Sequence, residues 1–415
     1  QARSAMSKQS GQAFDFYVAI IGSGFGGSVA ALRLTQKGYR VVVIEAGARF
    51  EDKDFAKSSF DLKRFLFFPR LGMLGIQRID FLKNVLVMSG AGVGGGSLVY
   101  ANTLYRPPAE FYQTGSWVGL EDWQTVLAPH YAEAERMLGV TKNPFFSPAD
   151  LMLKKSADRM GFGDSFQMAP LGVTFANGDQ QPGDSVGDPY FDGAGPDRRA
   201  CINCGECMTG CRHGAKNTLV KNYLYLAEQP GEGKTVAEVW PLTKVTEVRD
   251  LDGGGFELPL NRVAQGGHRG SIRAGQVVVA AGALGSARLL QRSRAAGYLA
   301  GMSDKLGELS RTNSESLLGV VARGTENNFS QGAAITSSVF PSADTHIEPV
   351  RYGRGSGFMG LLQSVLASSK SGKSPNPGRL ILATFKNLHR LPSFYNLRTW
   401  PERTLILLVM QARDN

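Results

Sequence analysis

The four cysteines of the chain lie close together, at Cys201, Cys204, Cys207 and Cys211. Their C-x2-C-x2-C-x3-C spacing is that of a bacterial ferredoxin loop, in which thiolates hold an iron–sulfur cluster. Arg212 follows the fourth cysteine where a proline is usual, and the chain has no second cysteine set. Cys211 is therefore either the fourth ligand or a free thiol, and in the second case the centre would hold three irons. A zinc site, which more typically joins two separated cysteine pairs, and thiols without metal are the alternatives.

A glycine-rich turn follows the first apolar run of the chain. Residues 15–21 (DFYVAII) predict a buried strand, and residues 28–37 carry small and apolar side chains at helical spacing. Between them lies the turn Gly22-Ser-Gly24-Phe-Gly26-Gly27, and residues 40–44 (RVVVI) predict a second strand. Together these elements form a βαβ unit, the context in which such a turn binds a dinucleotide.

The residues of this turn have distinct physical roles. Gly22 permits the tight turn, Gly24 lets the backbone approach a pyrophosphate, and Gly27 lets the helix pack closely on the strand. The helix N-terminus offers unpaired N–H groups to the phosphates. Glu45 lies 18 residues after Gly27, where it is placed to accept hydrogen bonds from the adenosine ribose. An acidic residue there disfavours a 2′-phosphate, and so disfavours NADP.

A second glycine run, with five glycines in seven residues, precedes Asn102 and reads Gly90-Ala-Gly92-Val-Gly94-Gly95-Gly96-Ser97. Such a run indicates positive φ angles or a close approach to a flat group. With the first turn, it resembles the glucose-methanol-choline (GMC) flavoprotein oxidoreductases, and among them the bacterial cholesterol oxidases that hold FAD non-covalently. The strand expected over residues 276–281, followed by Gly282, resembles the second signature of that family.

The resemblance implies contacts with FAD for the second glycine run and for Gly282, and it places Asn102 beside the isoalloxazine ring. Residues 346–353 resemble the sterol-oxidase segment that carries an active-site glutamate, here Glu348. In that role Glu348 would move a proton from the carbon next to a new ketone, converting a β,γ-enone to the conjugated α,β-enone. The alternative is a surface carboxylate in a loop.

The family also implies a catalytic histidine and a partner histidine or asparagine near the C-terminus. None of the five histidines, His130, His213, His268, His346 and His389, follows that late motif. The printed sequence stops shortly after an apolar strand expected over residues 405–410. We therefore expect a C-terminal truncation, with the catalytic base in the missing segment.

Composition and charge exclude several classes of function and location. Of 415 residues, 46 are Lys or Arg and 36 are Asp or Glu, and the basic residues form no runs, which argues against nucleic-acid binding. No apolar run is long enough to span a bilayer and no signal-peptide core is evident, so we expect a cytoplasmic protein. Residues 50–79 interleave basic and bulky apolar side chains, which indicates a packed lid or a part of the core, or else peripheral contact with an anionic membrane.

The expected fold is α/β, with a Rossmann-like FAD-binding domain and a split α+β substrate domain on an antiparallel sheet. We assign residues 14–110 and 215–315 to the first, residues 111–214 and 316–415 to the second, and residues 1–13 to a disordered tail. The expected function is FAD-dependent oxidation of a sterol-type secondary alcohol, with oxygen or a redox carrier as electron acceptor. Alternatives are an iron–sulfur FAD dehydrogenase for another bulky alcohol, and an inactive FAD-binding fragment.

Overall fold

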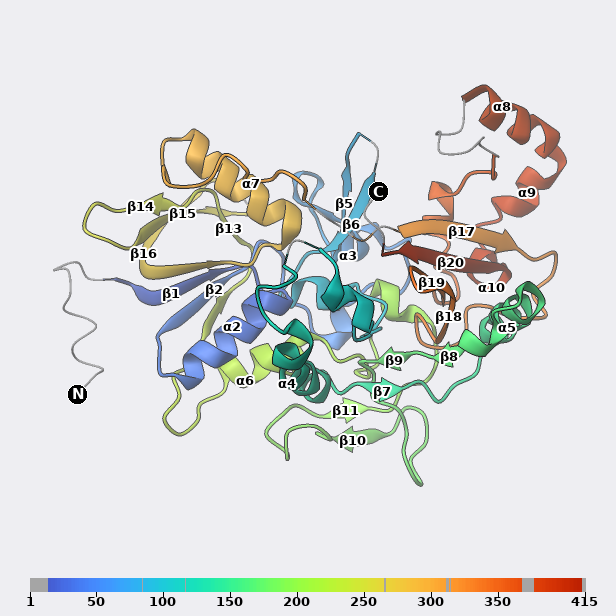
Figure 1. The fold of residues 1–415 in the computed structure, drawn as a ribbon, viewed down its shortest axis with the longest axis horizontal. Coiled ribbons are helices and arrows are strands. Elements are labelled where there is room, and N and C mark those ends of the chain that lie inside the picture. Colours follow the sequence, from blue (N-terminus) through green and yellow to red (C-terminus); the bar gives the residue numbers. More distant parts are fainter. Residues whose placement is uncertain are drawn as a thin grey trace.

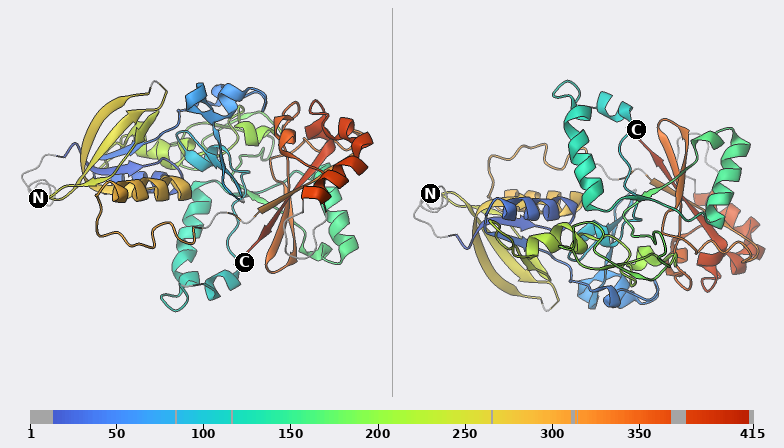
Figure 2. Two further views of the ribbon diagram at one scale, coloured as in Figure 1. Left: turned by 90° about the horizontal axis from the view of Figure 1, so that it is seen from above. Right: turned by 90° about the horizontal axis from the view of Figure 1, so that it is seen from below.

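The computed structural model describes residues 14–83, 85–115, 117–264, 266–310, 313, 315–367 and 377–412. The tail expected at residues 1–13 lies outside these ranges. Two sheets lie at opposite ends of the long axis, and residues 91–115 run between them (Figure 1). The views from above and below show the same arrangement (Figure 2). No helix in the described part of the chain is long and apolar enough to cross a membrane.

The larger sheet has seven strands. The parallel neighbours are, in order, β12 (Glu238–Trp240), β2 (Val41–Ile44), β1 (Phe16–Ile21) and β16 (His268–Val279). Antiparallel strands continue the sheet, with β15 (Phe256–Arg262) next to β16, and with β13 (Thr243–Val245) and β14 (Arg249–Asp250) paired to β15. The predicted βαβ unit is confirmed, because α2 (Phe25–Gln36) connects β1 to β2.

Strands β1 and β2 are buried on both faces, as is usual for parallel strands covered by helices. Val18 and Ile20 face a core that includes Leu32 of α2. The alternate residues Ala19 and Ile21 face a second core on the other side of the sheet, with α7 (Gly282–Ala295). The helix α6 (Tyr223–Glu228) packs on the α2 side.

The second sheet has five antiparallel strands in the order β17 (Glu315–Val321), β20 (Thr404–Gln411), β19 (Thr345–Val350), β18 (Ser337–Ser342) and β8 (Gln167–Met168). The apolar strand predicted over residues 405–410 is β20. The helix α5 (Pro148–Met160) packs on this sheet through Leu153 and Ala157, which contact Val339.

The remaining helices and strands lie outside these two sheets and their covering helices. They are α3 (Leu62–Phe65), β3 (Phe67–Phe68), β4 (Met73–Leu74), β5 (Gln77–Phe81), β6 (Leu86–Gly90), α4 (Trp123–Met137), β7 (Thr141–Lys142), β9 (Pro170–Leu171), β10 (Ser185–Gly187), β11 (Arg198–Arg199), α8 (Pro377–Lys386), α9 (Leu391–Phe394) and α10 (Trp400–Arg403). The strands of the larger sheet come from residues 14–110 and 215–315, and those of the antiparallel sheet from the other two ranges, except that β17 begins one residue earlier, at Glu315. The exact domain limits stay a prediction.

The turn between β1 and α2 depends on two glycines. Gly22 has a φ of +102°, and a Cβ there would lie 2.4 Å from the carbonyl oxygen of Ala280. A Cβ on Gly27 would lie 2.0 Å from the carbonyl oxygen of Gly22. Gly26, in the same turn, has open space at its Cβ position and no positive φ. The fold therefore constrains Gly22 and Gly27 but leaves Gly26 free to change.

Replacing Gly22 by alanine should lower the free energy of unfolding by on the order of 1–3 kcal/mol, because the backbone would be strained and the turn would have to separate from Ala280. The matched variant Gly26→Ala should unfold at a similar urea concentration to the unmodified protein. Chemical denaturation followed by circular dichroism measures both. Equal destabilisation of the two variants would contradict this account.

Candidate active site

The first glycine turn leaves the N-terminus of α2 accessible. Gly24 is the N-cap residue, and no side chain caps the helix. A Cβ placed on Gly24 or on Gly26 would meet no atom within 4 Å. The first N–H groups of a helix lack intrahelical partners and carry partial positive charge. The turn therefore fits a diphosphate, the group predicted for it.

Glu45 and Ser23 connect three turns next to the open N-terminus of α2. These are the first glycine turn, the turn at Gly47 and the second glycine run. One carboxylate oxygen of Glu45 accepts hydrogen bonds from the backbone N (3.1 Å) and Oγ (2.7 Å) of Ser23, and the other accepts from the N–H of Gly47 (2.8 Å). Ser23 Oγ in turn accepts from the N–H of Gly94 at 3.1 Å. Glu45 is buried. The contact of Glu45 with a ribose stays a prediction. The structure adds a second role that was not predicted, because Glu45 also stabilises the turns.

The second glycine run adopts the positive φ angles that its composition predicts. Gly92, Gly94 and Gly95 have φ values of +126°, +104° and +51°. A Cβ on Gly95 would lie 2.6 Å from Cα of Gly24, so the two glycine turns are in direct contact. Gly96 has open space beside Phe25. This contact explains why the second turn needs glycine at position 95.

Two further residues expected at the cofactor have different surroundings. Ser97 is buried, and its hydroxyl donates to the carbonyl of Gly94 (2.7 Å) and accepts from the N–H of Leu219 (3.0 Å). Its side chain therefore stabilises the glycine run. Gly282 begins α7 with a φ of +72° and has open space at its Cβ position. Cofactor contacts for both stay a prediction.

Asn102 follows the glycine run and is fully buried, with a φ of +74°. Neither its amide nitrogen nor its amide oxygen has a hydrogen-bond partner with good geometry among the described residues, and the side chain lies close enough to the Cys207 thiol to favour the ionised form of that thiol. A buried amide without partners is unfavourable, and its presence calls for a ligand or solvent. The unpaired amide fits the polar edge of a flavin ring, the contact that the family resemblance implies.

Glu348 lies on β19 and is almost completely buried, so the alternative of a surface carboxylate is wrong. Its Oε1 lies 3.5 Å from Nε2 of His346. Burial raises the pKa of Glu348 to about 8, and the charge of Glu315 adds to this effect. Burial lowers the pKa of His346 to about 4. At neutral pH this is therefore a neutral histidine beside a carboxyl group that is poised to exchange a proton.

Two aromatic side chains define the surroundings of this pair. Phe340 stacks on His346 with ring centroids 4.4 Å apart, and Tyr105 meets His346 edge-on at 4.9 Å. The Tyr105 hydroxyl donates to Ser338 Oγ at 2.8 Å. Sequence reasoning missed Tyr105 and gave His346 no role. Tyr105 follows Asn102 by three residues, so one short segment connects the glycine run to the Glu348 carboxyl.

The four cysteines line a single pocket, shared with His213, Ala215 and Lys216. All four are free thiols. Burial raises the pKa of the Cys204 thiol to about 12 and also raises the pKa of the Cys201 and Cys207 thiols. Within the described residues, the structure thus brings together the whole predicted ligand set, Cys211 included.

Lys216 connects this pocket to the glycine run, and sequence reasoning missed it. Its side chain is fully buried, and Nζ donates to the carbonyl oxygens of Leu98 (3.0 Å), Tyr100 (2.8 Å) and Cys207 (3.0 Å). Burial lowers the pKa of Lys216 to about 8. The cysteine loop and the candidate cofactor site therefore share one buried cation.

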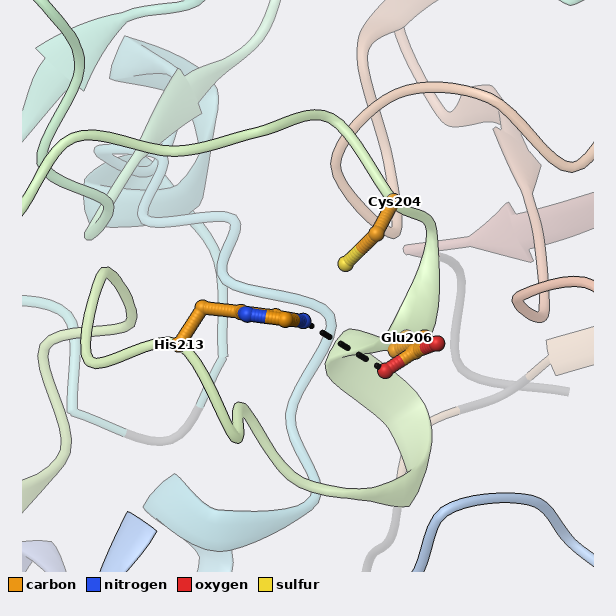
Figure 3. A group of neighbouring side chains, drawn as sticks. All are labelled: Cys204, Glu206 and His213. Carbon is orange, nitrogen blue, oxygen red and sulfur yellow. Dashed lines mark ion pairs between the residues drawn. The ribbon is translucent and has the colours of Figure 1, made fainter. Parts of the chain in front are cut away.

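A further group of possible metal ligands lies at the edge of the pocket. Cys204, Glu206 and His213 offer ligand atoms that all lie within 4.8 Å of one another (Figure 3). Nε2 of His213 is 3.7 Å from Oε2 of Glu206, and Arg212 forms an ion pair with the same carboxylate oxygen at 2.5 Å. The guanidinium group already neutralises Glu206, which weakens its attraction for a metal cation.

Comparisons with known proteins agree with this geometry. Residues 20–51 match an NAD(P)-binding Rossmann-like domain, and residues 194–299 match the GMC oxidoreductase family. The chain is 51% identical over 409 residues to a cholesterol oxidase of Mycobacterium tuberculosis, covering 97% of this chain and 70% of that protein. It is 41% identical over 411 residues to a cholesterol oxidase of Acinetobacter baumannii, covering 97% and 72%.

A solved structure shows the same fold. Pyridoxine 4-oxidase from Mesorbium loti superposes with a TM-score of 0.50 at 15% identity, covering 97% of this chain and 72% of that one. The likeness concerns the fold alone, whereas the sequence relatives establish the family. The expected resemblance is confirmed: this chain belongs to the GMC oxidoreductase family.

Proposed function

We propose that the protein oxidises the 3β-hydroxyl of a sterol to a ketone with FAD as cofactor, and then moves the neighbouring double bond into conjugation. The observation that carries this proposal is the buried carboxyl of Glu348 on β19, next to Tyr105 of the segment that follows the glycine run. The 51% identity to a cholesterol oxidase supports the choice of substrate. The family implies FAD.

The residues that would hold FAD are those with open space or unpaired polar atoms. The N–H groups at the start of α2 would bind the diphosphate, next to Gly24 and Gly26. The amide of Asn102 would gain the hydrogen-bond partners that it lacks. When bound, FAD supplies the acceptor for the hydride that leaves the carbinol carbon. With oxygen as the final acceptor, two electrons and two protons leave the alcohol as hydrogen peroxide.

Glu348 would carry out the isomerisation. As a carboxylate it takes a proton from the carbon between the new ketone and the double bond, and it returns a proton to the far carbon of that double bond. A general base works best when its pKa is near the working pH, and burial raises the pKa of Glu348 to about 8. The neutral His346 beside it adds no charge that would stabilise the carboxylate and weaken it as a base.

The cysteine pocket favours a second candidate function, a dehydrogenase that passes electrons to a one-electron carrier. Four thiols that converge beside the glycine run have no role in the oxidase reaction. Under this candidate the substrate would be another bulky alcohol, oxidised with two successive single-electron transfers to the carrier. The two candidates differ in substrate and in acceptor, and both can be measured.

Anaerobic addition of cholesterol should remove the visible absorbance of the oxidised flavin, and admission of air should restore it with formation of hydrogen peroxide. Spectrophotometry and a peroxide assay measure the two stages. Reduction by non-sterol alcohols alone, with reoxidation only by a carrier, would favour the second candidate. A flavin-loaded protein that no alcohol reduces would be an inactive fragment and would contradict both.

The variant Glu348→Gln should oxidise the sterol but release the unconjugated β,γ-enone, because the amide cannot accept the proton. In the unmodified protein the isomerisation rate should rise with pH up to about 8, where the carboxyl ionises. Ultraviolet absorbance of the conjugated enone measures both effects.

The exposed residue Glu315 provides the matched control for Glu348. Its negative charge raises the pKa of Glu348, so Glu315→Gln should keep the isomerisation and move the midpoint of its pH profile to lower pH. If the Glu348→Gln variant still isomerised the enone fully, Glu348 would not be the base of the isomerisation.

A surface formed by α3 and the residues around it fits peripheral contact with an anionic lipid bilayer. Phe60, Phe68 and Leu71 are exposed, with 47%, 47% and 67% of their surface accessible. The exposed cations Lys63, Arg64 and Arg70 lie among them in the sequence. Apolar side chains with interleaved basic residues bind anionic interfaces through both area and charge. Such contact would bring the site to a lipid substrate.

Changing these three cations to glutamine should weaken sedimentation with vesicles that contain phosphatidylserine, while binding to neutral phosphatidylcholine vesicles stays at its low level. The matched control is Lys142→Gln, Lys155→Gln and Arg159→Gln, which removes the same charge from exposed positions elsewhere. An equal loss in both triple variants would show that net charge alone determines binding.

A further inference from the structure

We propose that the loop of residues 201–211 binds an iron–sulfur cluster through all four cysteines, and that the buried ammonium of Lys216 balances its negative charge. Neither the sterol reaction nor the flavin site accounts for this pocket. The proposal is therefore independent of the substrate and of turnover.

The first argument is the convergence of the four thiols. In two-cluster ferredoxins with this spacing, the fourth cysteine serves the other cluster. Here Cys211 lines the same pocket as Cys201, Cys204 and Cys207, so one loop can supply four ligands. The loop wraps in this way because Asn203, Gly205 and Gly210 have positive φ angles of 56°, 74° and 99°.

The loop is also fixed against its neighbours. A Cβ on Gly205 would lie 2.0 Å from the carbonyl oxygen of Ser330, and the N–H of Gly332 donates to the carbonyl of Asn203 at 2.8 Å. The N–H of Cys201 donates to the carbonyl of Thr174 at 2.8 Å. These contacts fix the backbone that carries the cysteines, as a preformed ligand set requires.

The second argument is the spacing of the sulfur atoms. Four thiolates around one zinc ion lie about 3.8 Å apart, because each Zn–S bond is about 2.3 Å and the geometry is tetrahedral. Among the described residues, no three of the cysteine sulfurs lie within 4.8 Å of one another. The thiols are therefore not gathered as closely as a tetrahedral zinc site requires, which argues against zinc as the metal of this loop.

The third argument is electrostatic. Lys216 is buried, and its ammonium contacts three carbonyl oxygens. In the part of the chain that the structure describes, no carboxylate is among the hydrogen-bond partners of this ammonium. A buried charge without a counter-ion is strongly unfavourable. Four thiolates around a cluster carry net negative charge beside this ammonium, so each stabilises the other.

The full chain, purified without oxygen, should contain iron and acid-labile sulfide in amounts that match one cluster per chain. After reduction it should give an iron–sulfur signal in electron paramagnetic resonance. Cys204→Ser should lose or alter the signal, whereas His213→Ala, which removes a ligand only from the Cys204, Glu206 and His213 group, should keep it. Zinc without sulfide, or protein without metal, would overturn the assignment.

Lys216 is tested separately as a positioning residue. Lys216→Met should lower the reduction potential of the cluster, because a positive charge near it is lost, and Lys216→Arg should restore the potential. A redox titration followed by paramagnetic resonance measures the midpoints. Equal potentials in all three proteins would overturn the charge-balancing role. The iron and sulfide content of the unmodified chain decides whether a cluster binds even if a variant fails to fold.

Discussion

The buried hydrogen bonds between Glu45, Ser23 and the glycine turns determine the geometry of the cofactor end of the molecule. Glu45 accepts from Ser23 and Gly47, and Ser23 accepts from Gly94. These bonds fix three turns that come from separate parts of the chain. The close approach of Gly24 and Gly95 accompanies these bonds, and a Cβ on Gly95 would lie 2.6 Å from Cα of Gly24. A buried carboxylate satisfied by backbone and hydroxyl donors is thus the common support of both glycine motifs.

At the other end, an aromatic enclosure changes the chemistry of an ordinary carboxyl group. Glu348 and His346 face the same side of β19, two residues apart, and Phe340 on the neighbouring β18 covers the imidazole. Desolvation moves the two pKa values in opposite directions, which leaves both groups neutral near pH 7. The antiparallel sheet therefore sets the protonation states of these two groups as well as their positions.

The sequence predicted the local elements well. The βαβ unit, Gly22, Gly27 and the strand at β16 follow from short-range patterns, since glycine requirements and apolar runs are properties of neighbouring residues. It did not predict Tyr105, Lys216 or the contact of Ser97 with Leu219, because each depends on pairing between distant segments. The convergence of the cysteines could be predicted only in part. Their spacing indicated a metal-binding loop, but the position of Cys211 in the same pocket depends on the positive φ angles of Asn203 and Gly210. The late catalytic histidine expected from the family has no counterpart among the residues of this sequence.

Strand β20 pairs with β17 on one side and with β19 on the other. Because β20 follows both partners by more than 50 residues of chain, a ribosome releases β17 and β19 before the strand that joins them exists. Glu348 and Leu408 are partners in the β19–β20 ladder, so the backbone of β19 lacks this neighbour until β20 has emerged. Pairing between strands distant in the sequence is slow, and unpaired strand edges are prone to aggregation until it is complete.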